Sequence, residues 1–505
     1  CQEKFADNML YIRKYEKENT DEEDLKFLYS SEIRSISENV SKPQKTLAVK
    51  MVAPSTTYTN KNIVVNIPNV RKEVPLFIVF RALGVISDKA IIELCLLNLD
   101  KYEDMMDLFI PSVHDAGGIM TQKLAIEYIA TFTKSKQVDG VMRILTDYFL
   151  PHIGEINFKE KAYFLGYMVF RMLSVHNGLE KPTDRDNFKY KRIELIGSMM
   201  YDLFSEYFTE QQKYVRKQYD TRLSLNKAIY ENDLQSLITS FQNEIFKERI
   251  LEAGFKKAFK GNWGAHSHTK RIGVLQDLNR LSFNGYLFHL RKTNLALNAS
   301  NIIPPRLLHC SQWGYFDPVD TPDGGNIGLH KSLATSTHIS RGFSSREPLI
   351  NWLRENITMK IVDECNPLLL SNMTKVMVNG YWAGSIFDPF DCINKIKLYR
   401  RNALLPIDIS VTFDITLNTI FIYNDNGRLC RPIFYRDEET SKLSIESANV
   451  KNAIKSKDFT WQQLVCGFNE RKDNFNMFHN NIYDLDEIYH SVNKEKNPKK
   501  LERFI

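Results

Sequence analysis

The spacing of apolar residues changes several times along the chain, and this change limits the folds open to it. Around residues 45–67, two short runs rich in β-branched residues flank a polar turn, which is typical of a β-hairpin. From 75 to about 200, longer apolar clusters recur at helical spacing, and an amphipathic helical pattern continues from 197 to about 258. From Thr374 the pattern is again that of strands, and Asn426-Gly427 between the later runs is a strong signal for a hairpin turn. A chain of 505 residues with this alternation is too long for one core and predicts an α+β protein of several domains.

Composition narrows the class of protein. A hydrophobic share of 43% and a charged share of 25% are those of a globular protein. No run of about 18 apolar residues occurs, and the first residues lack the pattern of a signal peptide, so we expect an intracellular protein without a membrane partner. The seven cysteines form no C-x-x-C pair, which argues against a zinc ribbon or a disulfide framework, and we predict no metal site.

Positive charge is concentrated in one segment, residues 253–310, which we call the basic segment. It holds nine of the chain's 67 basic residues but only one of its 61 acidic residues, Asp277, so the remainder of the chain is slightly acidic. Phosphate backbones attract such a patch, whereas an ordinary solvated surface mixes both signs. The distribution favours nucleic acid as the partner over a plain basic face.

Several residues in and after the basic segment allow two interpretations. Trp263 lies between glycines, so its ring either faces a partner or anchors a core. Arg291 and Lys292 would diverge by about 100° on a helix and could hold phosphates on two sides of one strand, or form a solvated pair. Arg306 follows two prolines, which would keep the chain extended. They would also give the arginine a stiff support, which suits phosphate recognition.

The turn D-T-P-D-G-G-N at 320–326 places Asp320 and Asp323 across a tight bend. Such carboxylates hold a cation or fix the turn by bonds to the backbone, and turn stabilisation is the favoured interpretation. Three histidines, His266, His268 and His289, could support an enzyme mechanism. They lie among cations without an evident carboxylate partner, however, so ordinary packing or solvation is favoured.

Residues 261–334 carry five motifs in one run: G-N-W-G, L-N-R, H-L-R-K-T, P-R-L-L-H and W-G-x-x-x-P-x-x-T-P-D-G-x-x-x-G-L. With these motifs the run resembles the fork region of the second-largest subunit of multisubunit RNA polymerases. Further matches occur in family order across nearly the whole chain: SEIRS at 31–35, VPLFIVFRALGVISD at 74–88, FLGYMVFRML at 164–173, TDRDNFKYKRIELIG at 183–197, VNGYWAG at 378–384, LCRPIF at 429–434 and FTWQQL at 459–464. The G-N-W-G and F-R-A-L-G motifs point to the eukaryotic, archaeal and large-virus branch.

The resemblance implies positions for individual residues. Those expected along the nucleic-acid channel are Arg271, Gln276, Asn279, Arg280, His289, Arg291, Lys292, Arg306 and His309. Those expected in the fork loop and turn are Trp263, Asp320, Asp323 and Asn326. The chain departs from the family pattern at Lys292, Asp323, Gly325 and Asn187, and the roles of the last two are left open.

The resemblance also implies a domain plan of mixed helical lobe and protrusion, fork and a small mainly β module. The expected segments are 1–28 (end of a protrusion), 29–190 (lobe), 191–252 (helical return to the protrusion), 253–334 (fork), 335–440 (external region 1) and 441–505 (start of external region 2). Both ends look cut, so we expect only the upstream half of the subunit to be present.

RNA synthesis needs Mg²⁺ held by clustered carboxylates, and no such cluster is evident in the sequence. The resemblance places this metal on the largest subunit and on a region beyond the chain, so we expect no catalytic residue here and no activity from the chain alone.

The implied partners are the largest and smaller polymerase subunits, the DNA template, the RNA–DNA hybrid and ribonucleoside triphosphates. The alternative is a non-catalytic nucleic-acid-binding protein outside the family. The expected compartment is the nucleus or a viral or cytoplasmic transcription site.

Overall fold

The fold is described from a computed structural model. It covers residues 1–16, 26–39, 42, 44–54, 61–225, 234–246, 248–267, 269–295, 302–341, 345–401, 405–406, 408–433 and a few positions between 436 and 455. The chain forms two compact units. Unit 1 contains Cys1–Phe5, Asp186–Ser340 and Gly427–Arg431, and unit 2 contains Ala6–Arg185, Arg341–Asn426 and the described residues from Pro432 onward. The α+β class is confirmed. The motif at 459–464 and most of 441–505 lie outside the described residues.

The first part of unit 2 is a five-stranded antiparallel sheet covered by helices. The sheet order is β2-β3-β4-β5-β6, and its strands are Leu10–Lys14, Phe27–Ser35, Lys45–Val52, Ile63–Asn66 and Val74–Pro75. Strands β4 and β5 are the hairpin predicted around 45–67, which is therefore confirmed. Leu28 lies inside β3, so the domain boundary expected there falls within a sheet.

Helices follow β6, as the apolar spacing predicts. They are α1 (Leu76–Ala82), α2 (Asp88–Leu96), α3 (Glu103–Met106), α4 (Ile110–Asp115), α5 (Gln122–Thr131), α6 (Val138–Arg143) and α7 (Phe158–His176). A π-helical turn, Ile144–Tyr148, continues α6. The 19-residue α7 is buried along most of its length and contacts both α2 and β3, so it is the central helix of this core.

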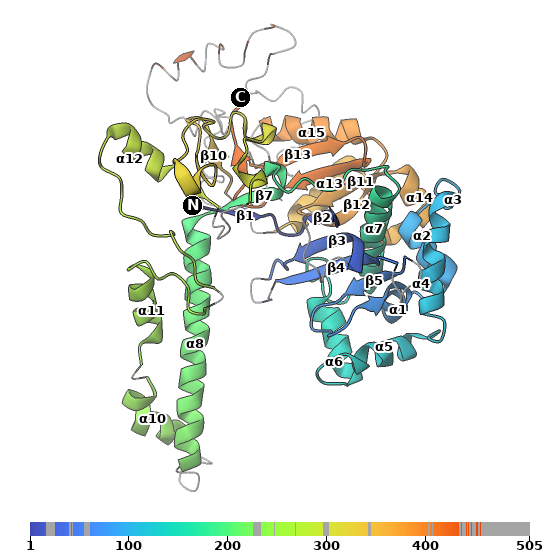
Figure 1. The fold of residues 1–505 in the computed structure, drawn as a ribbon, viewed down its shortest axis with the longest axis horizontal. Helices are drawn as coiled ribbons and strands as arrows, with labels where there is room; N and C mark the ends of the chain where they lie inside the picture. Colours follow the sequence, from blue (N-terminus) through green and yellow to red (C-terminus); the bar gives the residue numbers. More distant parts are fainter. Residues whose placement is uncertain are drawn as a thin grey trace. The chain divides into compact units, whose positions relative to one another are not determined.

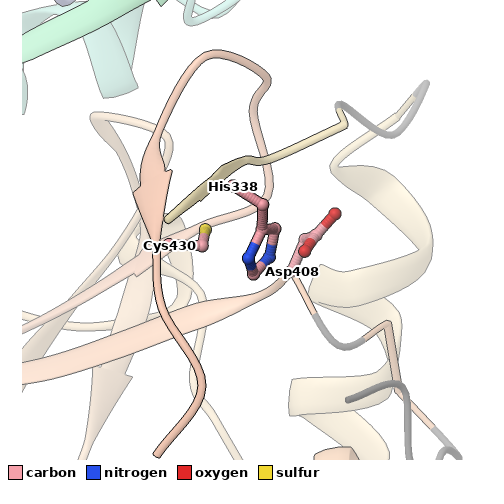
Figure 2. Close-up of side chains that lie close together, drawn as sticks. All are labelled: His338, Asp408 and Cys430. Atoms are coloured by element: carbon pink, nitrogen blue, oxygen red, sulfur yellow. The ribbon is translucent and has the colours of Figure 1, made fainter. Parts of the chain in front are cut away.

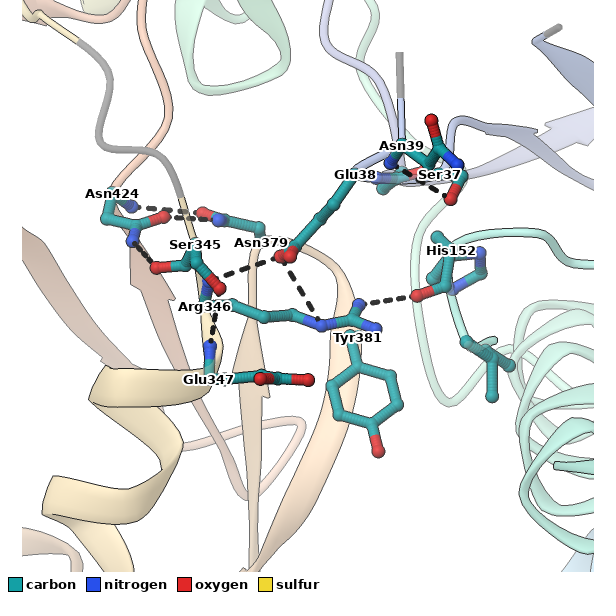
Figure 3. Close-up of polar contacts among 12 residues, drawn as sticks. Ser37, Glu38, Asn39, His152, Ser345, Arg346, Glu347, Asn379, Tyr381 and Asn424 are labelled. Carbon is teal, nitrogen blue, oxygen red and sulfur yellow. Dashed lines mark hydrogen bonds and ion pairs between the residues drawn. The ribbon is translucent and has the colours of Figure 1, made fainter. Parts of the chain in front are cut away.

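The second part of unit 2 is a mixed sheet of order β12-β11-β14-β13, with strands Tyr381–Ile386, Thr374–Val378, Thr419–Tyr423 and Ser410–Asp414. Helices α13 (Glu347–Ile357), α14 (Pro367–Asn372) and α15 (Pro389–Arg401) accompany it. Met377 and Trp382 belong to the same apolar cluster as α7, so both parts of unit 2 share one core. Polar contacts around Arg346 join the same two parts (Figure 3).

Unit 1 is built on a sheet of order β7-β1-β8-β9, with strands Lys191–Glu194, Gln2–Phe5, Lys292–Asn294 and His330–Ser332. A 30-residue helix, α8 (Ile196–Leu225), leaves β7, and α10 (Leu234–Ile245) and α11 (Ile250–Ala258) lie beside it (Figure 1). The predicted helices before the basic segment are thus confirmed. Helix α12 (Phe283–Leu290) precedes β8.

The hairpin expected at Asn426-Gly427 is wrong. Strand β15 (Leu429–Cys430) pairs with β10 (His338–Ile339) rather than with β14, and His338 lies opposite Cys430 (Figure 2). Gly427 instead has a φ of +79°, donates its backbone N–H to the Ser340 carbonyl oxygen and accepts from the Ile193 N–H. A Cβ at this glycine would lie 2.6 Å from the Ile193 carbonyl oxygen, so close backbone approach explains the glycine.

Candidate nucleic-acid interface

The basic segment lies entirely within unit 1, and Trp263 anchors its first loop. The Trp263 ring is buried in a cluster with Met199, Leu203 and Tyr207 of α8 and Ala258 of α11. Of the two interpretations left open by the sequence, the structure supports the core anchor. The ring is therefore not presented to a partner.

Arg271 closes this loop. Its backbone N–H donates to the Trp263 carbonyl oxygen at 3.0 Å. Its guanidinium forms an ion pair with Glu194 and lies 3.4 Å from the Gln2 side-chain oxygen. Because this guanidinium already pairs with a carboxylate of the neighbouring sheet, Arg271 is a poor candidate for binding phosphate.

Gln276, Asn279 and His289 are brought together, as expected for residues sharing one site. The Asn279 backbone N–H donates to His289 Nδ1 at 3.0 Å, so Nε2 carries the ring hydrogen. That nitrogen donates to the Gln276 side-chain oxygen at 2.9 Å, and the Gln276 amide nitrogen donates to the Gly273 carbonyl oxygen at 2.9 Å. This chain of bonds folds the loop back onto α12. Arg280 beside it is exposed, and its guanidinium lies 4.6 Å from the centre of the Tyr286 ring.

Arg291 and Lys292 do not share a helix, so the geometry assumed for them is wrong. Arg291 directly follows α12, which ends at Leu290, and Lys292 opens β8. The Arg291 guanidinium donates to the carbonyl oxygens of Ala334 and Thr337, at 2.8 and 2.6 Å. Those two backbone acceptors fix the arginine in place, and only Lys292 of the pair keeps its charged group available.

Arg306 also faces its own protein. Pro304–Arg306 forms a 3-10 turn, so the extended conformation expected after the prolines is wrong. The guanidinium donates to the carbonyl oxygens of Ile302, Gly325 and Ile327 at 3.0, 2.7 and 2.9 Å. Since three carbonyl groups take its hydrogens, Arg306 holds the 320–328 turn in place.

The carboxylates of that turn fit the favoured interpretation only in part, because Asp320 bonds to a side chain of β9 rather than to the backbone of the turn. Asp320 accepts a hydrogen bond from the Ser332 hydroxyl, and the Thr321 hydroxyl accepts from the Gly328 N–H at 2.8 Å. Asp323 begins the short 3-10 turn Gly324–Asn326 and is exposed, as is Asn326. One carboxylate fixes the turn while the other faces solvent, so the two do not converge as ligands of a cation.

Two further histidines of the basic segment, His309 and His266, have ordinary polar roles. His309 Nδ1 contacts the Ser311 hydroxyl at 2.7 Å and accepts from its backbone N–H, which caps the turn Cys310–Gln312. His266 Nε2 lies 3.6 Å from a Glu210 carboxylate oxygen on α8, so the expectation that it has no carboxylate partner is wrong. His268 lies outside the described residues.

A buried charged cluster beneath the interface has no local sequence signal. Glu3, Thr293, Lys191 and Lys331 come from the four different strands of the unit 1 sheet. A Glu3 carboxylate oxygen lies 3.2 Å from Lys331 Nζ and 3.3 Å from the Thr293 hydroxyl, and the other lies 3.7 Å from Lys191 Nζ. Burial lowers the pKa of Lys191 even though Glu3 opposes this effect. The four residues are up to 328 positions apart, so only the fold joins them.

Comparisons with known proteins show which family the chain resembles. Three family models match: RNA polymerase Rpb2, domain 2, at residues 48–194; domain 3 at 276–339; and domain 4 at 376–437. Most of the basic segment therefore lies in the domain 3 match.

The chain is also similar to whole polymerase subunits. It is 33% identical over 492 residues to DNA-directed RNA polymerase II subunit 2 of Arabidopsis thaliana, covering 94% of this chain and 40% of that protein. It is 34% identical over 486 residues to subunit RPB2 of Encephalitozoon cuniculi, with the same two coverages. An archaeal relative, subunit Rpo2 of Saccharolobus solfataricus, is 28% identical over 421 residues, 79% of this chain and 35% of the relative.

The chain thus spans about 40% of the length of its eukaryotic relatives. The three domain models match it in the order 2, 3, 4 along the sequence, as the family order of its motifs requires. A nucleic-acid-binding protein outside the polymerases is not favoured by these matches. The chain belongs to the family of second-largest subunits of multisubunit DNA-directed RNA polymerases.

Proposed function

We propose that this chain works as part of a DNA-directed RNA polymerase, in which unit 1 lines the nucleic-acid channel beside the transcription bubble. The observation that carries the proposal is the concentration of positive charge in the basic segment, on a unit whose domain 3 match covers residues 276–339. Cations that face solvent on a rigid support attract phosphate backbones without selecting a base sequence.

The chain supplies a binding surface rather than the catalytic metal site. Mg²⁺ is the expected cofactor of the assembled enzyme, but the carboxylates near the basic segment do not fit it. Glu194 forms an ion pair with Arg271, Glu206 accepts a hydrogen bond from the Ala265 N–H, and Asp320 accepts one from the Ser332 hydroxyl. We therefore assign the metal to another subunit or to a region of the subunit outside this chain, and we expect no nucleotidyl transfer by this chain alone.

The partners in this proposal are the largest and smaller polymerase subunits, the DNA template, the RNA–DNA hybrid and ribonucleoside triphosphates. We place the protein in the nucleus or another compartment in which DNA is transcribed. No described helix is long and apolar enough to cross a membrane.

Purification of the native complex through a tag on this chain tests the proposal. The complex should contain a protein of the largest-subunit family and should extend an RNA primer on a DNA template with Mg²⁺ and nucleotides. The separately expressed 505-residue chain should extend none. A native complex without polymerase subunits, or extension by the isolated chain, would contradict the proposal.

A further inference from the structure

Six of the nine cations of the basic segment fall into two groups with different surroundings. The arginines Arg271, Arg291 and Arg306 donate to acceptors of their own protein. Lys257, Lys260 and Lys270 are exposed, and no carboxylate lies within ion-pair distance of any of them among the described residues. Three of the four arginines, the residues best suited by chemistry to bidentate phosphate binding, are therefore occupied, whereas Lys257, Lys260 and Lys270 are available.

The carboxylates around these lysines are already used. Glu252 of α11 lies 2.6 Å from Lys256 and 3.4 Å from Arg249. Glu206 of α8 accepts from the Ala265 N–H at 2.9 Å and from the Thr269 hydroxyl at 3.1 Å. Glu210 lies 2.8 Å from Lys213. The local charge of Lys257, Lys260 and Lys270 is thus left uncompensated by the fold, whereas ordinary surfaces intersperse the two signs.

Chain geometry brings the three lysines to one end of α11. The Lys260 N–H donates to the Lys257 carbonyl oxygen at 3.2 Å, in the turn that ends the helix. The following loop returns at the bridge between Trp263 and Arg271. Lys270 immediately precedes this bridge, and a Cβ placed on Gly264 would lie 3.0 Å from the Lys270 Cα. The loop therefore returns Lys270 to the end of the helix that carries the other two.

The support beneath the lysines is tightly packed. A Cβ on Gly254 of α11 would lie 2.5 Å from the Tyr207 ring of α8, so the two helices approach closely at this point. The Gln211 side-chain oxygen accepts from the Ile250 N–H at 2.8 Å and caps the start of α11. The Tyr207 hydroxyl donates to the Gly264 carbonyl oxygen at 3.4 Å. Helix and loop are held against α8, which limits the entropy lost when a ligand binds their lysines.

We propose that Lys257, Lys260 and Lys270 form the phosphate-binding surface of the basic segment, and that they contact a nucleic-acid backbone without regard to its sequence. This assignment rests on the channel role under Proposed function. It differs from the sequence expectation, in which Arg291, Lys292 and Arg306 were the candidates for phosphate contacts. The guanidinium groups of the two arginines donate to backbone carbonyl groups of their own chain, so substitution of these arginines changes structure before it changes binding.

The test is a fluorescence anisotropy titration of the 505-residue chain with a labelled mixed-sequence single strand. Binding is measured between about 50 and about 200 mM salt. For the triple variant Lys257→Gln, Lys260→Gln and Lys270→Gln, the slope of log affinity against log salt should fall by about 2, since each single-strand contact contributes about 0.7. Changing all three residues to arginine should retain the wild-type slope. Thermal melting should be unchanged in both variants, because the three side chains are exposed.

A matched control removes the same charge elsewhere. Lys123, Lys134 and Lys181 are exposed lysines of unit 2, and their triple change to glutamine should leave the salt slope at the wild-type value. If wild-type protein binds with a steep salt dependence and both glutamine triples behave alike, the lysine assignment is overturned while the channel role stands. If wild-type protein shows no salt-dependent binding, the assignment and the channel role both fail.

Discussion

The guanidinium of Arg346 lies over the ring of Tyr381, 4.1 Å from its centre, at the place where the two parts of unit 2 meet (Figure 3). The same guanidinium donates to the His152 carbonyl oxygen and lies 3.5 Å from Glu38. The Tyr381 hydroxyl donates to Glu160 on α7 at 2.8 Å. A single arginine at the start of α13 thus contacts segments that are separated from it by about 200 to 300 residues in the sequence.

Replacement of Arg346 by alanine should weaken the junction between these parts. The change leaves the His152 carbonyl group and Glu38 without their charged donor, and we expect a loss of about 2 to 3 kcal/mol. Hydrogen exchange followed by mass spectrometry should show lower protection in peptides of both α7 and β12. Arg354→Ala is the control, because Arg354 lies on the same helix in an exposed pair with Glu364 at 3.6 Å. Equal protection in the two variants would show that Arg346 does not join the parts.

Replacement of Arg306 by alanine should loosen the turn at 320–328. The variant loses the donors to Gly325 and Ile327, so we expect faster hydrogen exchange in this turn and little change in melting temperature. Lysine should restore protection in part, since one ammonium cannot reproduce the planar set of donors. Arg280→Ala serves as the control because that guanidinium lies over Tyr286. Unaltered exchange in the Arg306 variant would return Arg306 to the candidates for phosphate.

The sequence predicts features whose causes are local. The hairpin of β4 and β5 follows from two β-branched runs, and α7 follows from apolar residues at helical spacing. Backbone conformations and side-chain contacts that depend on residues far away in the sequence were not predicted. Gly427 carries a local hairpin signal, but Ile193 and Ser340 determine its conformation. Arg306 has the stiff neighbours expected of a phosphate contact, yet its side chain bonds to carbonyl groups of the 320–328 turn, which the local sequence does not reveal.

The Glu3 cluster should be sensitive to the charge of its one acid. Glu3→Gln leaves Lys191 and Lys331 buried without their counter-ion, and we expect a loss of about 3 kcal/mol or more. Urea unfolding followed by circular dichroism measures this loss. Adding Lys191→Met removes one buried cation and should recover part of the stability, which a loss of packing alone at residue 3 could not explain. A double variant no more stable than Glu3→Gln would contradict the charge argument.

His152 should make folding stability depend on pH. The ring is fully buried, with Nδ1 2.7 Å from the Ser35 hydroxyl, and burial together with Arg346 and Lys161 lowers its pKa well below the ordinary value of 6.5. Below about pH 6.5 the unfolded chain therefore binds a proton that the folded chain excludes. The contribution of the neutral ring is complete above this pH and is lost as the pH falls, by about 1.4 kcal/mol per pH unit. Urea unfolding at pH 7.5, 6.5 and 5.5 measures how the free energy of unfolding changes with pH. About 1.4 kcal/mol of the loss between pH 7.5 and 5.5 should vanish in His152→Gln. His114→Gln, which changes an exposed histidine of the same unit, should keep the slope. Whatever stability His152→Gln itself costs at pH 7.5, the test depends on the change with pH, and equal slopes in the wild-type protein and the His152 variant would refute the assignment.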